Sequence, residues 1–163
     1  MTRRRRTVAS IVAAGVIVAA CGDADDSADS LPSVEVIAAD GAPADTADWT
    51  GEPLVVNFWF STCPPCAKEL RDFAAVDAER GDVVRFIGVN PIDEVDVMES
   101  FAAERGVEYD NFRDPIGDLQ IELEITSFPT TVFVGSDGEV VERRGVLDAD
   151  QLHEAIDELL AAE

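Results

Sequence analysis

The stretch "VVNFWFSTCPPCAKEL", residues Val55 to Leu70, decides the fold and raises the question of function. Its apolar half ends abruptly at two cysteines separated by two prolines, and a charged segment with helix-favouring residues follows. The N-terminus of such a helix presents unpaired N–H groups and a positive partial charge to the residues that precede it. Four kinds of site fit Cys63 and Cys66 at this junction: a structural disulfide, a metal site, a catalytic nucleophile or a redox pair.

Residues 1–20 are interpreted as a signal peptide of the lipoprotein type. Arg3 to Arg6 form a positively charged N-terminal region. Val8 to Ala20 is an apolar run, shorter than the roughly 20 residues that a membrane-spanning helix needs. The run ends at Cys21 in "VAACG", which resembles a bacterial lipobox, where cleavage leaves a lipidated cysteine at the N-terminus. An uncleaved short anchor is the alternative, and both interpretations place the rest of the chain outside the cytoplasm. Arg5 and Arg6 are compatible with a twin-arginine export signal, and an ordinary general secretion signal would have a similar sequence.

Residues 21–32 are interpreted as the lipidated cysteine and a flexible tether. The segment "GDADDSADSLP" is short, acidic and polar, and it has no apolar face to bury. The folded domain is therefore expected over residues 33–163. A domain of roughly 130 residues buries about two-thirds of the surface that its unfolded chain exposes, so it needs no disulfide in order to fold.

The composition is strongly acidic. The sequence contains 12 Lys and Arg against 34 Asp and Glu, a net charge of −22. The signal peptide holds four of the arginines and no acidic residue, so the remaining chain has 8 basic and 34 acidic residues and a net charge of −26. This charge argues against nucleic-acid binding and against electrostatic docking on an anionic membrane. It is compatible with a basic partner or a salty medium, and a well-solvated acidic surface is the simpler interpretation.

Hydrophobic patterning predicts alternating strands and helices along the domain. The expected strands are Val34–Ala38, Pro53–Phe60, Val83–Val89, Thr130–Gly135 and Glu139–Arg144. The expected helices are Pro64–Arg80, one after a cap at Asp93, a short one at Asp118–Glu124, and a last one after a capping box of Asp148 and Gln151.

This order predicts an α/β fold. Alternating strands and helices favour a parallel sheet with helical crossovers. The dipeptide Asp137-Gly138 predicts a hairpin, which would add antiparallel edge strands. We therefore expect a mixed sheet with helices on both faces, in three layers.

The spacing of Cys63 and Cys66 suits reversible disulfide chemistry. Two cysteines in the first turn of a helix lie at about the Cα separation that a disulfide needs. The helix N-terminus favours a thiolate at Cys63, while Cys66 falls on the packing face of the helix. Pro64 and Pro65 fit the first turn, because the N–H groups that they lack would have no partner within the helix.

The other kinds of site are less well supported by the sequence. A structural zinc site takes four ligands, and the single histidine, His153, lies in the expected C-terminal helix. A structural disulfide that closes so short a loop gains little from loop entropy. A protease-type thiol would need a histidine to activate it. The sequence therefore favours a redox pair, with no metal and no cofactor.

The segments "NFWFSTCPPCAKEL" and "SFPTTVFV" resemble the thioredoxin superfamily, and specifically its exported, membrane-tethered TlpA-like branch, over about Val34 to Glu163. The resemblance implies a thioredoxin-like fold and a cis proline that faces the two cysteines, here Pro129. An ordinary trans proline at the start of an edge strand is the alternative. In the family, backbone groups beside this proline pair with an extended substrate, a role that falls here on Phe128 and Thr130.

The resemblance also suggests supporting residues. Glu69 stands where TlpA-like reductases have a carboxylate implicated in proton handling, although an exposed carboxylate stabilised by the helix dipole is an alternative. Asn57 replaces a buried Asp of cytoplasmic thioredoxins. Trp59 matches an aromatic residue beneath the active site, for which a place in the core is also a sufficient explanation. Thr62 departs from the aromatic residue that the family often has before the first cysteine, and residues 90–117 fit the helix–strand insertion of the branch.

The function that the resemblance implies is an extracytoplasmic, membrane-tethered thiol-disulfide oxidoreductase. Cys63 would attack a substrate disulfide and Cys66 would resolve the mixed disulfide. Reduction of exported proteins, such as apocytochromes, is favoured, with a membrane thiol or electron transporter as redox partner and a monomeric protein. A thiol oxidase of the same fold and a non-catalytic copper or haem delivery module are the alternatives, and the scarcity of Met and His speaks against copper.

Overall fold

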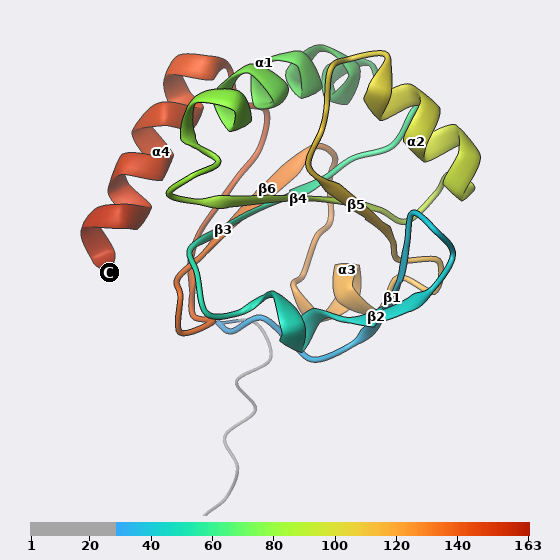
Figure 1. Cartoon of the computed structure of the whole chain (residues 1–163). Helices are drawn as coiled ribbons and strands as arrows, with labels where there is room; N and C mark the ends of the chain where they lie inside the picture. Colours follow the sequence, from blue (N-terminus) through green and yellow to red (C-terminus); the bar gives the residue numbers. More distant parts are fainter. Residues whose placement is uncertain (1–28) are drawn as a thin grey trace, which may run out of the picture.

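The computed structural model describes residues 29–163 (Figure 1). The expected signal peptide, Cys21 and most of the tether lie outside the described residues. The strands are β1 (Glu35–Ala38), β2 (Pro43–Asp45), β3 (Leu54–Phe58), β4 (Arg85–Asn90), β5 (Asp110–Arg113), β6 (Thr130–Val134) and β7 (Val140–Arg144). The helices are α1 (Pro64–Arg80), α2 (Val95–Ala103), α3 (Asp118–Glu122) and α4 (Ala149–Ala162), with a short 3-10 helix, η1, at Thr46–Trp49.

All of these strands join one sheet, in the order β2-β1-β5-β4-β3-β6-β7. Strands β3, β4 and β5 are parallel, whereas β6 is antiparallel to β3, and β1 is antiparallel to β5. The carboxyl ends of the parallel strands therefore lie at the same end of the sheet, next to the amino end of β6. The loop that leads from β3 to Cys63 lies at this end of the sheet.

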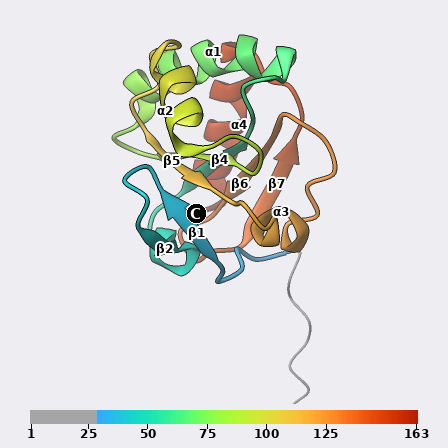
Figure 2. The same ribbon diagram turned by 90° about the vertical axis from the view of Figure 1, so that its right-hand side faces the viewer.

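Helices cover both faces of the sheet, which confirms the predicted three-layer α/β fold. Figures 1 and 2 show α1, α2 and α4 on one side and the short α3 on the other. Strand β3 is buried along its whole length, because its alternate side chains enter two different cores. Val55 packs with α1 and α4, whereas Val56 and Phe58 pack with α3 and Trp49 of η1.

The hairpin strands differ in position from the sequence-based expectation. Both were expected to be edge strands of the sheet. Strand β6 instead lies between β3 and β7, so only β7 of this pair is an edge strand. The burial of β6 between two neighbours requires the mostly apolar sequence of its five residues, whereas β7 carries charged side chains. Strand β2 and η1 were not predicted, because three residues that include a proline give little periodic signal.

The described part of the tether packs against the domain. Leu31 donates its N–H to the Gly138 carbonyl at 2.9 Å, and Val140 donates to the Asp29 carbonyl at 2.8 Å. Leu31 also packs against the core beside α3. Asp29 and Leu31, which were expected to belong to the tether, therefore contact the folded domain.

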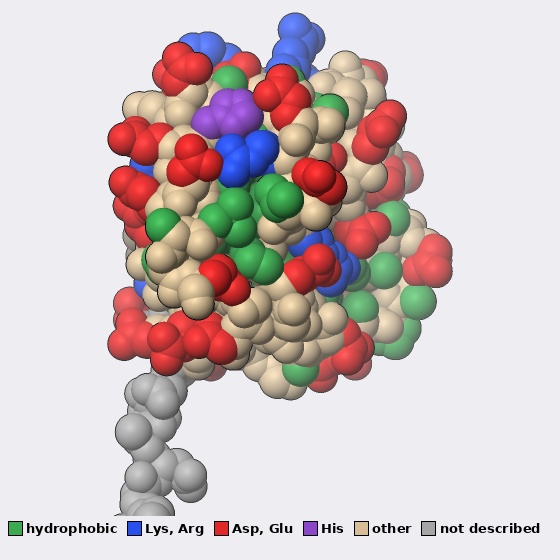
Figure 3. All heavy atoms as spheres, turned by 60° about the vertical axis from the view of Figure 1, so that its left-hand side comes forward, with side chains coloured by type: hydrophobic (Ala, Val, Ile, Leu, Met, Phe, Trp, Pro, Cys, Tyr) green, Lys and Arg blue, Asp and Glu red, His purple; other side chains and the backbone are tan. Residues whose placement is uncertain are grey.

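The surface bears many carboxylates, as the composition requires. Figure 3 shows acidic side chains spread over the visible face, among smaller areas of hydrophobic and basic side chains. Within residues 29–163, no helix has the length and apolar character needed to cross a membrane.

Candidate redox site

Cys63 and Cys66 form a disulfide where β3 passes into α1. Cys63 is the N-cap residue of α1, and the Cα atoms of the two cysteines lie 5.3 Å apart. Both belong to a buried apolar cluster that includes Trp59, Leu70 and Met98. The β3–β4 ladder is extended toward the site by a hydrogen bond of 3.0 Å from the Trp59 N–H to the Val89 carbonyl.

The two sulfurs have different environments. Cys63 is 4% exposed, whereas Cys66 is completely buried. The backbone N–H of Cys66 donates to Sγ of Cys63 at 3.3 Å. Because Pro64 and Pro65 lack N–H groups, this is the first N–H of the helix, and it points at the outer sulfur. The arrangement favours a thiolate at Cys63 once the disulfide opens.

The loop before β6 lies beside the redox pair. The Phe128–Pro129 peptide bond is cis, Pro129 is buried, and Thr130 pairs with Phe58 at the carboxyl end of β3. The ring of Phe128 contacts that of Phe60 edge to face, with centroids 5.2 Å apart. Both rings pack against the cluster that contains the cysteines. The structure therefore places Phe128 against the cluster that contains the disulfide, and Pro129 and Thr130 follow it in the chain.

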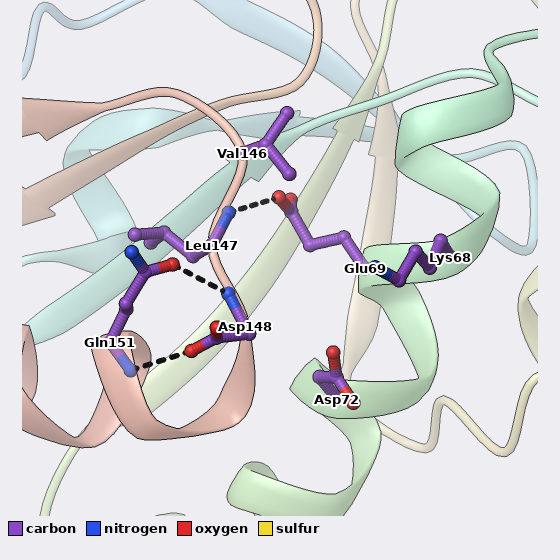
Figure 4. A pocket seen from close by; sticks show the side chains of 7 residues that line it. All are labelled: Lys68, Glu69, Asp72, Val146, Leu147, Asp148 and Gln151. Carbon is purple, nitrogen blue, oxygen red and sulfur yellow. Dashed lines mark hydrogen bonds between the residues drawn. The ribbon is translucent and has the colours of Figure 1, made fainter.

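Glu69 is buried, and the alternative of an exposed helical carboxylate is wrong. Its side chain is 1% exposed and accepts two hydrogen bonds, from Nδ2 of Asn57 and from the backbone N–H of Leu147, each 2.8 Å long. Figure 4 shows the hydrogen bond from Leu147. Burial raises the pKa of Glu69 to about 7, although both hydrogen bonds act to lower it. Asn57 reaches Glu69 because it points to the α1 face of β3, where it also donates to Oγ1 of Thr131.

A small cleft opens beside Glu69, between α1 and the loop that precedes α4. Its volume is about 120 Å³, and Lys68, Asp72 and Val146 line it together with Glu69 (Figure 4). Cys66 and Glu69 lie three residues apart, on one side of the helix. A carboxyl group with a pKa near neutrality, in such a position, can take up and release a proton at the pH where thiol exchange occurs.

Trp59 forms part of the buried floor of the site. Its ring stacks on Phe101 of α2, with centroids 5.8 Å apart. Gly88 in β4 leaves room for this packing, because a Cβ atom at that position would lie 2.8 Å from Nε1 of Trp59 and 2.0 Å from Oδ1 of Asn111. The tryptophan therefore serves both as core and as support for the cysteine loop.

Asp93 is a residue of the site that sequence reasoning missed. It was expected to cap α2, but the N-cap residue is Glu94, and Asp93 instead accepts hydrogen bonds from the N–H and the hydroxyl of Ser61. The available signal was the position of Asn90 at the carboxyl end of a buried parallel strand, with Asp93 three residues later, where α/β proteins build their sites.

His153 takes no part in the site. It lies on α4 with Nε2 3.4 Å from a carboxylate oxygen of Glu79. Within the part of the chain that the structure describes, no three His, Cys, Asp or Glu side chains are arranged to hold a metal ion.

Comparison with known proteins identifies the family. The Redoxin family model matches residues 26–157. The chain belongs to the Redoxin family. It is 32% identical over 113 residues to sporulation thiol-disulfide oxidoreductase A of Bacillus subtilis, a match that covers 66% of this chain and 68% of that protein. It is also 32% identical over 123 residues to the thiol:disulfide interchange protein HelX of Rhodobacter capsulatus, covering 74% and 68%.

Solved structures agree with this assignment. This redoxin superposes with a TM-score of 0.70 on a secreted Mycobacterium tuberculosis disulfide oxidoreductase described as homologous to E. coli DsbE. The two sequences are 26% identical, and the match covers 78% of this chain and 96% of the other. The predicted membership of the thioredoxin superfamily, in its TlpA-like redoxin branch, is therefore confirmed, and the chain is related to thiol-disulfide oxidoreductases.

The raised pKa of Glu69 predicts a pH-dependent contribution to stability. Because the folded protein binds this proton more tightly than the unfolded chain, the contribution is fully present below pH 4.5 and is lost as the pH rises through about 7. Relative to Glu69→Gln, the free energy of unfolding of the wild type should fall by about 2 to 3 kcal/mol between pH 4.5 and pH 8. Urea unfolding of both proteins across this range measures the difference.

The control is Glu122→Gln, which removes an exposed carboxylate from α3. Its unfolding free energy should follow that of the wild type with pH. A constant difference between the wild type and Glu69→Gln at every pH would show that Glu69 does not exchange its proton in this range.

Proposed function

We propose that this redoxin reduces disulfides in exported proteins through Cys63 and Cys66. The observation that carries the proposal is the asymmetric pair at the helix N-terminus, with Cys63 receiving the first N–H of α1 and Cys66 buried beneath it. The relationship to thiol-disulfide oxidoreductases supports the same chemistry. The protein acts as a monomer without metal or cofactor.

The exchange proceeds in two steps. The Cys63 thiolate attacks one sulfur of the substrate disulfide, which forms a mixed disulfide and releases the first substrate thiol. Cys66 then attacks Sγ of Cys63, which releases the second substrate thiol and leaves the Cys63–Cys66 disulfide. Two electrons pass from the redoxin to the substrate, and two protons end on the substrate thiols. Glu69 accepts the proton of Cys66 as that thiol becomes a nucleophile.

The substrate segment binds along the loop before β6. Phe128 and Thr130 flank the cis proline, and Phe128 contacts Phe60, which precedes the cysteine turn. An extended peptide beside Pro129 would place its own disulfide against Cys63. Apocytochromes with oxidised cysteine pairs are substrates of suitable chemistry, and a membrane thiol or electron transporter returns two electrons to the Cys63–Cys66 disulfide after each cycle.

The proposed location is the outer face of the cytoplasmic membrane or the periplasmic side. A basic start and an apolar run precede Cys21, where a lipid would hold the domain through its acidic tether. The similarity to a secreted disulfide oxidoreductase supports a place outside the cytoplasm. Such compartments contain the disulfides on which a reductase acts.

Replacement of the buried cysteine should stop the cycle at its intermediate. In an insulin-reduction assay with dithiothreitol, we expect turnover by the wild type and none by Cys66→Ala. After the reductant has been removed, reduced Cys66→Ala should instead accumulate a mixed disulfide with insulin. Cys63→Ala is the matched control, because it should lose turnover without trapping substrate. Tight copper binding by a wild-type protein that has no reductase activity would instead support the delivery module.

The reduction potential of the Cys63–Cys66 couple tests the direction of electron flow. Potentials in related folds range from about −270 mV for thioredoxin to about −120 mV for a strong oxidant. A reductase should lie near the lower value, as measured by equilibration with glutathione or dithiothreitol buffers. A potential near the upper value would make the protein a thiol oxidase while leaving the site unchanged.

The lipid anchor predicts that Cys21→Ser is released from the membrane. The full-length wild type, expressed in a bacterium that processes lipoproteins, should partition into the detergent phase of a Triton X-114 extract. The Cys21→Ser variant should move to the aqueous phase or remain unprocessed, whereas Cys63→Ser should partition like the wild type. A Cys21→Ser protein that is cleaved like the wild type and still partitions into the detergent phase would contradict lipidation.

A further inference from the structure

Ser61 and Asp93 join two loops at the edge of the sheet that carries the redox pair. Ser61 lies in the turn before Cys63, and Asp93 lies between β4 and α2. The Ser61 N–H donates to Oδ2 of Asp93 at 2.6 Å, and the Ser61 hydroxyl donates to Oδ1 at 2.7 Å. Both carboxylate oxygens are therefore used to hold one residue of the cysteine turn.

The carboxylate itself is fixed by Asn90, the last residue of β4. Asn90 is fully buried, and its Nδ2 donates to Oδ2 of Asp93 at 2.8 Å. Its Oδ1 accepts the backbone N–H groups of Ile92 and Asp93, at 3.0 and 2.8 Å. This closed network leaves the Asp93 side chain little freedom to move relative to the sheet.

Asp93 carries a negative charge at neutral pH. Burial acts to raise its pKa, but the hydrogen bonds from Asn90 and Ser61, with the nearby charge of Arg113, hold the pKa below its usual range. Hydrogen bonds to an ionised acceptor are about twice as strong as those between neutral groups. The two hydrogen bonds from Ser61 to the charged Asp93 carboxylate therefore restrain the motion of the loop that contains Ser61.

The turn that Asp93 holds determines the position of Cys63. The Cys63 N–H donates to the Phe60 carbonyl at 3.2 Å, which closes a turn that contains Ser61. Cys63 then begins α1 and places its sulfur against the N–H of Cys66. A change in the Ser61 backbone is thus transmitted to the outer sulfur through a single turn.

We propose that Asp93 is a positioning residue for the redox pair, which stabilises the Cys63–Cys66 disulfide relative to the dithiol by holding Ser61. The inference rests on the proposed function, because it concerns the same exchange. Without the two hydrogen bonds between Ser61 and Asp93, the two thiols spend less time in the geometry that closes the disulfide. The equilibrium therefore shifts toward the dithiol.

The test is the equilibrium with glutathione, in which each protein disulfide reduced consumes two glutathione thiols and produces one glutathione disulfide. For Asp93→Ala we expect the equilibrium constant to shift toward the dithiol by about tenfold, the effect of losing hydrogen bonds to a charged group. Asp93→Asn, which retains one acceptor oxygen, and Ser61→Ala, which retains the backbone bond, should shift it in the same direction by less. The control Asp96→Ala removes the same charge from an exposed position at the start of α2, and should stay within about twofold of the wild type.

Unfolding of the oxidised and reduced forms separates positioning from a merely structural role. A positioning residue should stabilise the oxidised form more than the reduced form, by the factor seen in the glutathione equilibrium. Equal destabilisation of both forms, with an unchanged equilibrium constant, would overturn the inference. If Asp93→Ala does not fold, Asp93→Asn and Ser61→Ala decide by the same measurements.

The wild type distinguishes this inference from the proposed function. A wild-type protein that exchanges with glutathione while the Asp93 and Ser61 variants have its equilibrium constant overturns the role of Asp93 alone. A wild type that forms neither a glutathione mixed disulfide nor a dithiol under reducing conditions overturns the proposed function, and the role of Asp93 with it.

Discussion

The first N–H of helix α1, on Cys66, points at the sulfur of Cys63, and the chemistry of the site depends on holding that geometry. Two features of the chain produce it. Pro64 and Pro65 remove the earlier N–H groups, and the fully buried strand β3 delivers the chain to the helix in a fixed direction. The outer sulfur therefore lies at the positive end of a helix while the inner one is part of the core.

The buried carboxylate of Glu69 also fixes the position of α1. It links α1 to Asn57 of β3 and to Leu147 in the loop before α4, so one side chain ties three segments together. A charged group in such a place is costly unless it is paired, which explains why its pKa rises toward neutrality. The group that strengthens the contact of α1 with the sheet is thus also suited to exchange a proton beside Cys66.

Much of the fold and the site followed from local patterns. The strand–helix junction, the two cysteines and the capping box of α4 each depend on residues close in sequence, where propensity and hydrogen bonding act directly. Strand β2, the interior position of β6 and the role of Asp93 did not follow. Each depends on which segments become neighbours in the sheet. Asp93 lies at a suitable position in the sequence for a helix cap. In the structure, however, its carboxylate accepts two hydrogen bonds from the N–H and the hydroxyl of Ser61, which lies in another loop.

The sequence by itself determined that a redox-capable cysteine pair stands at a helix N-terminus in an α/β domain, because both cysteines lie within one helical turn. Only the tertiary structure decided the surroundings of that pair. It buried Glu69 instead of exposing it, brought Phe128 against Phe60, and placed Asp93 on Ser61. The physical reason is that burial and pairing of polar groups depend on contacts between residues far apart in the chain, which local periodicity does not contain.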